Sequence, residues 1–119
     1  MKDFKKLVIW QKGMELVEDV YRIVGLLPSE EKYGLRSQAT RSAVSIVLNI
    51  AEGSAKSSNK EYKKFLETAL GSAFELETTL LLMDRLKMID HKISVELVEK
   101  VLVEQRMVNS FIKTVKGDG

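Results

Sequence analysis

The sequence has no cysteine, one histidine and one proline among its 119 residues. Without cysteine, the chain can form no disulfide, no thiolate metal site and no cysteine nucleophile, which fits a reducing compartment. The apolar part of the N-terminus covers only residues 7–10, too short for a signal peptide, and no apolar run approaches the roughly 20 residues of a membrane span. We therefore expect a cytoplasmic protein without a membrane partner.

The scarcity of histidine also bears on catalysis. The one histidine, His91, is expected in a turn, and Met88 stands three residues before it, where a di-metal helical bundle needs a glutamate. The G-x-S-x-G and G-x-x-x-x-G-K-[ST] patterns do not occur, and Glu75 and Glu77, two residues apart, point to different faces of a helix. We therefore expect a protein that is not an enzyme and has neither a cofactor nor a bound metal.

Apolar residues recur with the period of an amphipathic helix in four segments, and the sequence shows no strand-like alternation of any length. The spacing predicts helices over about residues 6–26, 34–52, 59–86 and 94–115. Because the connections between them are short, neighbouring helices should be antiparallel. We predict an all-α fold, an up-down-up-down four-helix bundle forming a single domain over residues 1–119.

Several residues mark the expected helix ends. Ser58 and Glu61 match the S-x-x-E capping box, which places the start of the third helix near Asn59. Ser94 is a candidate N-cap for the fourth helix. Gly53 is expected to end the second helix, because glycine adopts the left-handed conformation that follows many helices.

Each expected helix carries an apolar stripe that should face the core. In the first helix this stripe is Leu7, Trp10, Met14, Val17, Tyr21 and Val24. In the third helix it is Tyr62, Leu66, Ala69, Ala73, Leu76, Leu80 and Met83. Asn49 falls on the stripe of the second helix, so we expect it to face inward and to fix the register between helices.

The third helix has more apolar surface than one stripe requires. A second stripe runs beside the first, formed by Leu70, Phe74 and Leu81 and flanked by Phe65 and Leu82. One interpretation makes this the central helix of the bundle. The other makes the second stripe an interface between subunits, because large exposed apolar patches mark association surfaces.

Charge is unevenly distributed although the net charge is only +2. Residues 56–64 carry four lysines against one glutamate, and residues 1–12 carry four lysines against one aspartate. Residues 65–84 carry four acidic and no basic residues. The lysines indicate a basic end suited to a polyanion such as RNA or DNA. The alternative interpretation is a solvated face with no ligand.

Four segments carry a resemblance to a known family. They are F-x-x-L-V-I-W-Q-K at residues 4–12, E-K-Y-G-L-x-S-Q-x-x-R at 31–41, S-I-x-x-N-I-A-E-G at 45–53, and K-E-Y-x-x-F-L-x-x-A-x-G-S-x-x-E-L-E at 60–77. In this order they resemble the four-helix-bundle proteins of the 23S ribosomal RNA intervening-sequence family. Only the fourth helix lacks a distinctive motif.

The resemblance implies a bacterial four-helix bundle that assembles as a homopentamer. A similar group, the accessory variability proteins of diversity-generating retroelements, binds a reverse transcriptase and nucleic acid. The resemblance supplies no catalytic residue.

We therefore expect an oligomeric, non-enzymatic bundle that binds nucleic acid or a nucleic-acid-processing partner such as a reverse transcriptase. The candidate phosphate contacts are Lys56, Lys60, Lys63 and Lys64 with Arg36 and Arg41. The alternative is a protein-interaction scaffold that does not contact nucleic acid directly.

Overall fold

The computed structural model describes residues 2–31 and 34–115. These residues form four α-helices, α1 (Val8–Val24), α2 (Leu35–Ser54), α3 (Asn59–Arg85) and α4 (His91–Thr114), with two short 3₁₀ helices, η1 (Phe4–Lys6) and η2 (Ser29–Glu31). The all-helical fold with four helices is confirmed. The molecule is elongated, 49 × 22 × 22 Å.

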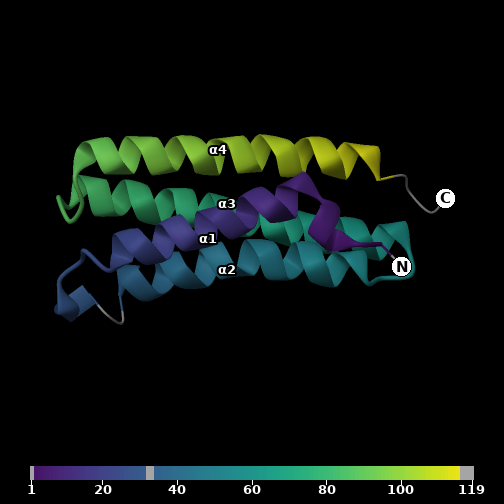
Figure 1. Ribbon diagram of the computed structural model, residues 1–119, viewed down its shortest axis with the longest axis horizontal. Helices are drawn as coiled ribbons and strands as arrows, with labels where there is room; N and C mark the ends of the chain where they lie inside the picture. The colour runs from purple at the N-terminus through teal and green to yellow at the C-terminus, as the bar shows by residue number, and fades with distance from the viewer. Residues whose placement is uncertain (1, 32–33, 116–119) are drawn as a thin grey trace.

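The four helices lie side by side along the long axis (Figure 1). The α1–α2 and α3–α4 connections lie at one end, whereas the α2–α3 connection lies at the other end together with η1 and the end of α4. This arrangement decides which charged segments meet.

The helix ends show one confirmed cap and two differences from the sequence prediction. Ser58 caps α3, its side chain accepting a hydrogen bond of 3.1 Å from the Glu61 amide. The fourth helix begins earlier than predicted, because Asp90 is the N-cap and accepts from the Lys92 amide. Ser94 lies inside this helix and is buried, so its prediction as a cap was wrong.

Gly53 does not end α2, which continues to Ser54. Its lack of a side chain serves packing instead. A Cβ atom at this position would lie 2.8 Å from Cβ of Phe65 and 3.1 Å from Cδ1 of Tyr62, too close for ordinary contact. Glycine therefore lets α2 approach the first turns of α3 closely.

The predicted core stripe of α3 is confirmed, since all seven of its residues are buried. The stripe predicted for α1 was right only in part: Val24 is buried, and Leu7, Trp10 and Val17 are half-buried against the core. Met14 and Tyr21 are 40% and 55% exposed, and the buried residues of this helix are Ile9, Gly13, Leu16, Val20, Ile23 and Val24. Gly13 explains why this face of α1 is the buried one. A Cβ there would lie 2.7 Å from Cγ1 of Val47, so the face that carries the glycine can pack tightly on α2.

Asn49 does not link helices. It is half-buried, and its side-chain amide donates to the carbonyl oxygen and hydroxyl of Ser45 in its own helix, at 2.8 and 3.0 Å. A polar link between helices is made one turn earlier, where the Ser45 and Ser72 hydroxyls lie 2.8 Å apart between α2 and α3. The register prediction for Asn49 was therefore wrong.

Candidate nucleic-acid interface

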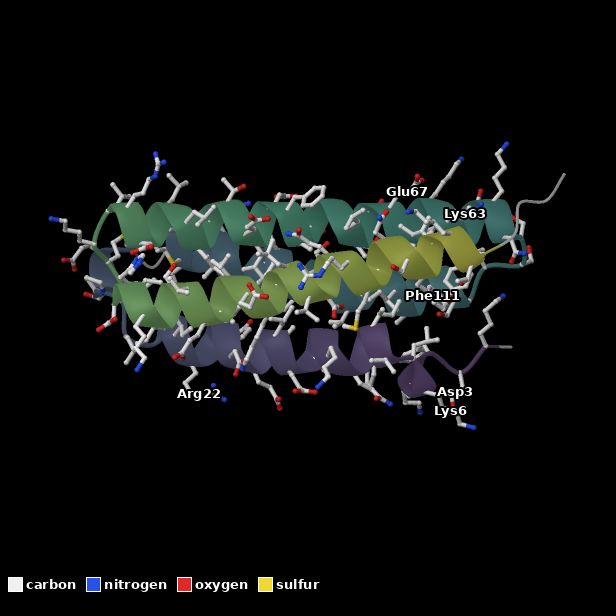
Figure 2. The ribbon with its side chains drawn as sticks, turned by 90° about the horizontal axis from the view of Figure 1, so that it is seen from above. Asp3, Lys6, Arg22, Lys63, Glu67 and Phe111 are labelled. Carbon is white, nitrogen blue, oxygen red and sulfur yellow. The ribbon has the colours of Figure 1, made fainter. Side chains whose placement is uncertain are left out.

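Three of the predicted phosphate contacts lie at the start of α3. The Ser58 cap fixes where the helix begins, so Lys60, Lys63 and Lys64 fall in its first two turns. Lys60 and Lys64 are exposed and Lys63 is half-buried. Figure 2 labels Lys63 and Glu67 on this same helix, near its start.

Lys56, in the α2–α3 connection, is held by an aromatic ring. Its ammonium nitrogen lies 4.8 Å from the centroid of the Phe65 ring, a cation–π distance. The lysine is half-buried as a result. Its charge stays at the start of α3, while its side chain also covers one face of Phe65.

The N-terminal segment crosses to the same end of the molecule. The ammonium nitrogen of Lys2 lies 5.1 Å from the centroid of the Tyr62 ring in α3. Residues 2–5 also line a hollow of about 390 Å³ with Ala51, Ser54 and Ala55 at the end of α2. The two lysine clusters, separate in the sequence, therefore meet in space.

We call this region the basic end. Its cations are Lys2, Lys5, Lys6, Lys56, Lys60, Lys63 and Lys64, with Lys113 in the last turn of α4. Figure 2 shows Lys6 and Lys63 at this end on opposite sides of the bundle. The positive charge therefore surrounds the tip of the molecule and is not confined to one face.

Acidic residues at the basic end are fewer, and two of them serve the helix starts. A carboxylate oxygen of Asp3 accepts from the Lys5 amide at 3.2 Å and so caps η1. Glu61 lies in the first turn of α3, where a negative charge favours the helix dipole. The lysines outnumber these carboxylates, so the end stays positive.

The structure does not bring Arg36 and Arg41 to the basic end. Arg36 is at the opposite end of α2, about 30 Å away at 1.5 Å per residue. Its guanidinium donates twice to the carbonyl oxygen of Val24, at 3.0 and 2.7 Å, and thus caps the end of α1. Arg41 is exposed about two turns into α2, in a shallow groove with Tyr21 and Leu48.

The second apolar stripe of α3 is only partly exposed. Phe74 and Leu81 are 52% and 43% exposed, whereas Leu70 is half-buried against the core and Phe65 is half-buried beneath Lys56. Leu82, at 42%, adds to the exposed part. An apolar surface therefore remains on α3 between the two ends of the bundle.

Lys2, Lys5 and Lys6 belong to a lysine cluster that is visible in the sequence, but they were not among the predicted phosphate contacts. The alternation of helix directions was the available signal, because it brings the starts of the first and third helices to one end. Among residues 2–31 and 34–115, the acidic and histidine side chains form no group of three or more that could hold a metal ion. Within the same ranges, every helix is too short or too polar to cross a membrane.

The fold and the charged tip together define an elongated helical bundle with a lysine-rich end. The chain belongs to the 23S rRNA-intervening sequence protein family, whose model matches residues 5–110. Among solved structures it is similar to a protein of unknown function from the S23 ribosomal protein family of Bacteroides thetaiotaomicron, with a TM-score of 0.84 and 27% identity over 90% of this chain and 100% of that one. A comparison with curated proteins gives no match.

Proposed function

We propose that this protein is a non-enzymatic, antiparallel four-helix bundle that assembles as a homo-oligomer and binds nucleic acid in the cytoplasm through its basic end. The supporting observation is the meeting of two lysine clusters around one tip, with Lys2 over Tyr62 and Lys56 over Phe65. Lysines suit this function because phosphate contacts position a nucleic acid without reading its sequence.

The placement of the α3 lysines favours a ligand over a solvated face. Lys60 lies in the first turn of the helix, where the positive end of the dipole disfavours a cation by about 0.3–1 kcal/mol, and Lys63 and Lys64 follow in the second turn. The dipole of α3 therefore does not stabilise the charge of Lys60. A phosphate chain at this helix start would neutralise both the lysines and the dipole.

Assembly would multiply the effect of a modest patch. Each copy in a homo-oligomer repeats the basic end, and repeated patches raise the affinity for a polyanion through effective concentration. We propose that the exposed part of the α3 stripe, Phe74 with Leu81 and Leu82, is covered by another copy. The family resemblance makes a homopentamer the assembly to test first.

RNA is the first polyanion to test, because the family's description refers to intervening sequences of 23S rRNA. The experiment is fluorescence anisotropy with a structured RNA and a DNA duplex at low salt. Changing Lys60, Lys63 and Lys64 to glutamate should weaken binding by about a hundredfold, since three phosphate contacts become repulsive. The substitutions favour the α3 dipole, so the fold should be retained.

A matched control removes the same charge from the other end. Changing Arg85, Lys87 and Lys92 to glutamate alters the net charge equally, at exposed positions beside the α3–α4 connection. This control should lose much less affinity. Equal binding by the wild type and the Lys60, Lys63 and Lys64 variant would refute the proposal.

The second candidate is a scaffold that binds another protein, such as a reverse transcriptase, without touching nucleic acid. The exposed Phe74 and Leu81 favour it, because an apolar surface of α3 suits a protein partner as well as a second copy. Recovery of one defined protein after exhaustive nuclease treatment, with no anisotropy change on added RNA or DNA, would favour the scaffold.

A further inference from the structure

Glu104 of α4 has a carboxyl group that is buried inside the bundle. The residue is 1% exposed, and within residues 2–31 and 34–115 neither carboxylate oxygen has a hydrogen-bond partner. Buried carboxylates are ordinarily paired with a cation or hydrogen-bonded, because an unpaired charge in apolar surroundings is strongly disfavoured. Whether Glu104 is neutral or charged therefore depends on whether its carboxyl group is protonated.

The surroundings of Glu104 are apolar. The carboxylate oxygen Oε2 would lie 3.1 Å from a Cβ at Gly13 of α1, and Ile46 and Val47 of α2 surround the same glycine position. Gly13 is thus the residue that leaves room for the carboxyl group between α1, α2 and α4.

The charged groups of the surrounding helices are engaged elsewhere. On α1, Lys12 and Glu15 form an exposed pair of 3.5 Å with each other. Between α1 and α4, Lys100 pairs with Asp19 at 3.0 Å, and burial raises the pKa of Asp19 less than its bonds to Arg22 and Lys100 lower it.

The neighbouring polar groups on α3 and α4 also pair with groups other than Glu104. On α3, Glu77 accepts from the side chain of Gln105 at 2.8 Å, and Glu99 and Arg106 of α4 pair at 3.7 Å near the surface. Toward Gly13, α2 presents Ile46 and Val47. Burial alone therefore raises the pKa of Glu104, from an ordinary 4.5 to about 8.

We propose that Glu104 acts as a proton-controlled latch on α1: protonated, it lies neutral beneath Gly13, and when it loses its proton it drives α1 away from α4. The device goes beyond the proposed nucleic-acid binding and does not depend on it. The packing of α1 against α4 therefore depends on pH.

The surface along the contact between α1 and α4 is hollowed, so we expect water to approach the carboxylate from this side. Three hollows of about 580, 170 and 260 Å³ follow it from the basic end to the opposite end. Neighbouring hollows share residues, Met107 lining the first two and Lys100 the last two. The α2–α3 contact is closer, held by Gly53 and by the Ser45–Ser72 link.

The sign of the pH effect follows from the two proton affinities. The unfolded chain releases this proton near pH 4.5 and the folded protein near pH 8. Between these values the folded state binds one proton more than the unfolded state, so stability falls as pH rises and levels off above about pH 8.

The first test is denaturant unfolding of the wild type and Glu104→Gln, which keeps the shape and removes the titration. Relative to the variant, the unfolding equilibrium constant of the wild type should rise about tenfold per pH unit between about pH 5 and 8. Glu99→Gln, an exposed change on the same helix, should show no such gap relative to the wild type. A wild-type to Glu104→Gln ratio that is constant with pH overturns the proposal.

The second test follows α1 itself. Trp10, the only tryptophan, lies in α1 one turn before Gly13, half-buried with its ring 5.3 Å from that of Phe4. Between pH 7 and 9 its emission should shift to the red in the wild type but not in Glu104→Gln, while the far-ultraviolet circular dichroism of both is retained. An unchanged wild-type emission overturns the latch.

A third measurement needs no variant. The side-chain carboxyl ¹³C resonance of Glu104 in the wild type should titrate near pH 8. Titration in the ordinary range of glutamate overturns the proposal even if Glu104→Gln does not fold.

Discussion

The two ends of the bundle use charge in opposite ways. At the end that holds the α1–α2 and α3–α4 connections, the charged groups stabilise the fold: Arg36 caps α1 through the Val24 carbonyl oxygen, Asp90 caps α4, and Asp84 lies 2.8 Å from His91. At the basic end, Lys60 stands in the first turn of α3, where the helix dipole disfavours a cation, and Lys63 and Lys64 follow it. Charged side chains therefore stabilise the fold at one end, and we infer that the lysines at the other end serve a ligand.

Breaking the proposed homo-oligomer should have the largest of these effects, because in such an assembly each copy repeats the basic end. Changing Phe74 and Leu81 to glutamate places two charges on the exposed α3 stripe and should convert the oligomer to monomers. Nucleic-acid affinity should then fall by at least tenfold through lost multivalency. Light scattering across a size-exclusion column measures the mass, with and without RNA.

The control for assembly is Leu48→Glu, a change of equal charge per site on α2, where the leucine is 60% exposed outside the α3 stripe. An unchanged mass in the Phe74 and Leu81 variant would show that this stripe does not join the subunits.

The next effect in size concerns Arg36. Its replacement by alanine removes two charge-assisted hydrogen bonds to the Val24 carbonyl oxygen and should lower the free energy of unfolding by about 2 kcal/mol. RNA affinity should not change, because this end does not contact the ligand in our account. Urea unfolding and anisotropy measure the two quantities.

Arg41→Ala is the matched control, since Arg41 is exposed on the same helix and its one polar contact, to the Ser37 hydroxyl, is 3.5 Å long. It should change stability by less than about 0.5 kcal/mol. A large loss of RNA binding in Arg36→Ala would show that Arg36 contacts phosphate after all. The two ends would then not differ in function as we infer.

The smallest effects concern the two helix caps. Ser58→Ala at the basic end and Asp90→Ala at the other end each remove one cap and should each lower the free energy of unfolding by about 1 kcal/mol. The aspartate change should be the larger, because a carboxylate also favours the dipole. Thermal unfolding compares them, and the opposite order would contradict the electrostatic account of these helix starts.

The core of α3 was predictable because one stripe of residues from Tyr62 to Met83 keeps a single period. The first helix was not, because two apolar stripes run one residue apart along it: one contains Trp10 and Val17, the other Ile9 and Leu16. Periodicity cannot choose between them. The small size of Gly13 could have identified the buried stripe, because a glycine suits the face that packs closest to a neighbour.

The lysine content of the candidate site could be predicted from the sequence, but the arrangement of its residues in space only in part. Both lysine clusters are visible in the sequence, and helices that alternate in direction bring them together. Arg36 and Lys56 lie at opposite ends of α2, so the length of this helix separates them, which a count of basic residues does not reveal. The isolation of Glu104 depends on which side chains surround it, and only packing shows that.

The most direct test of the central claim is the salt dependence of RNA binding by the wild type and by a variant with Lys60, Lys63 and Lys64 changed to alanine. If these lysines contact phosphates, the slope of log affinity against log salt should become shallower by about 2 to 3 in the variant, because fewer counterions are released. A variant slope equal to that of the wild type would show that the basic end is not the binding surface.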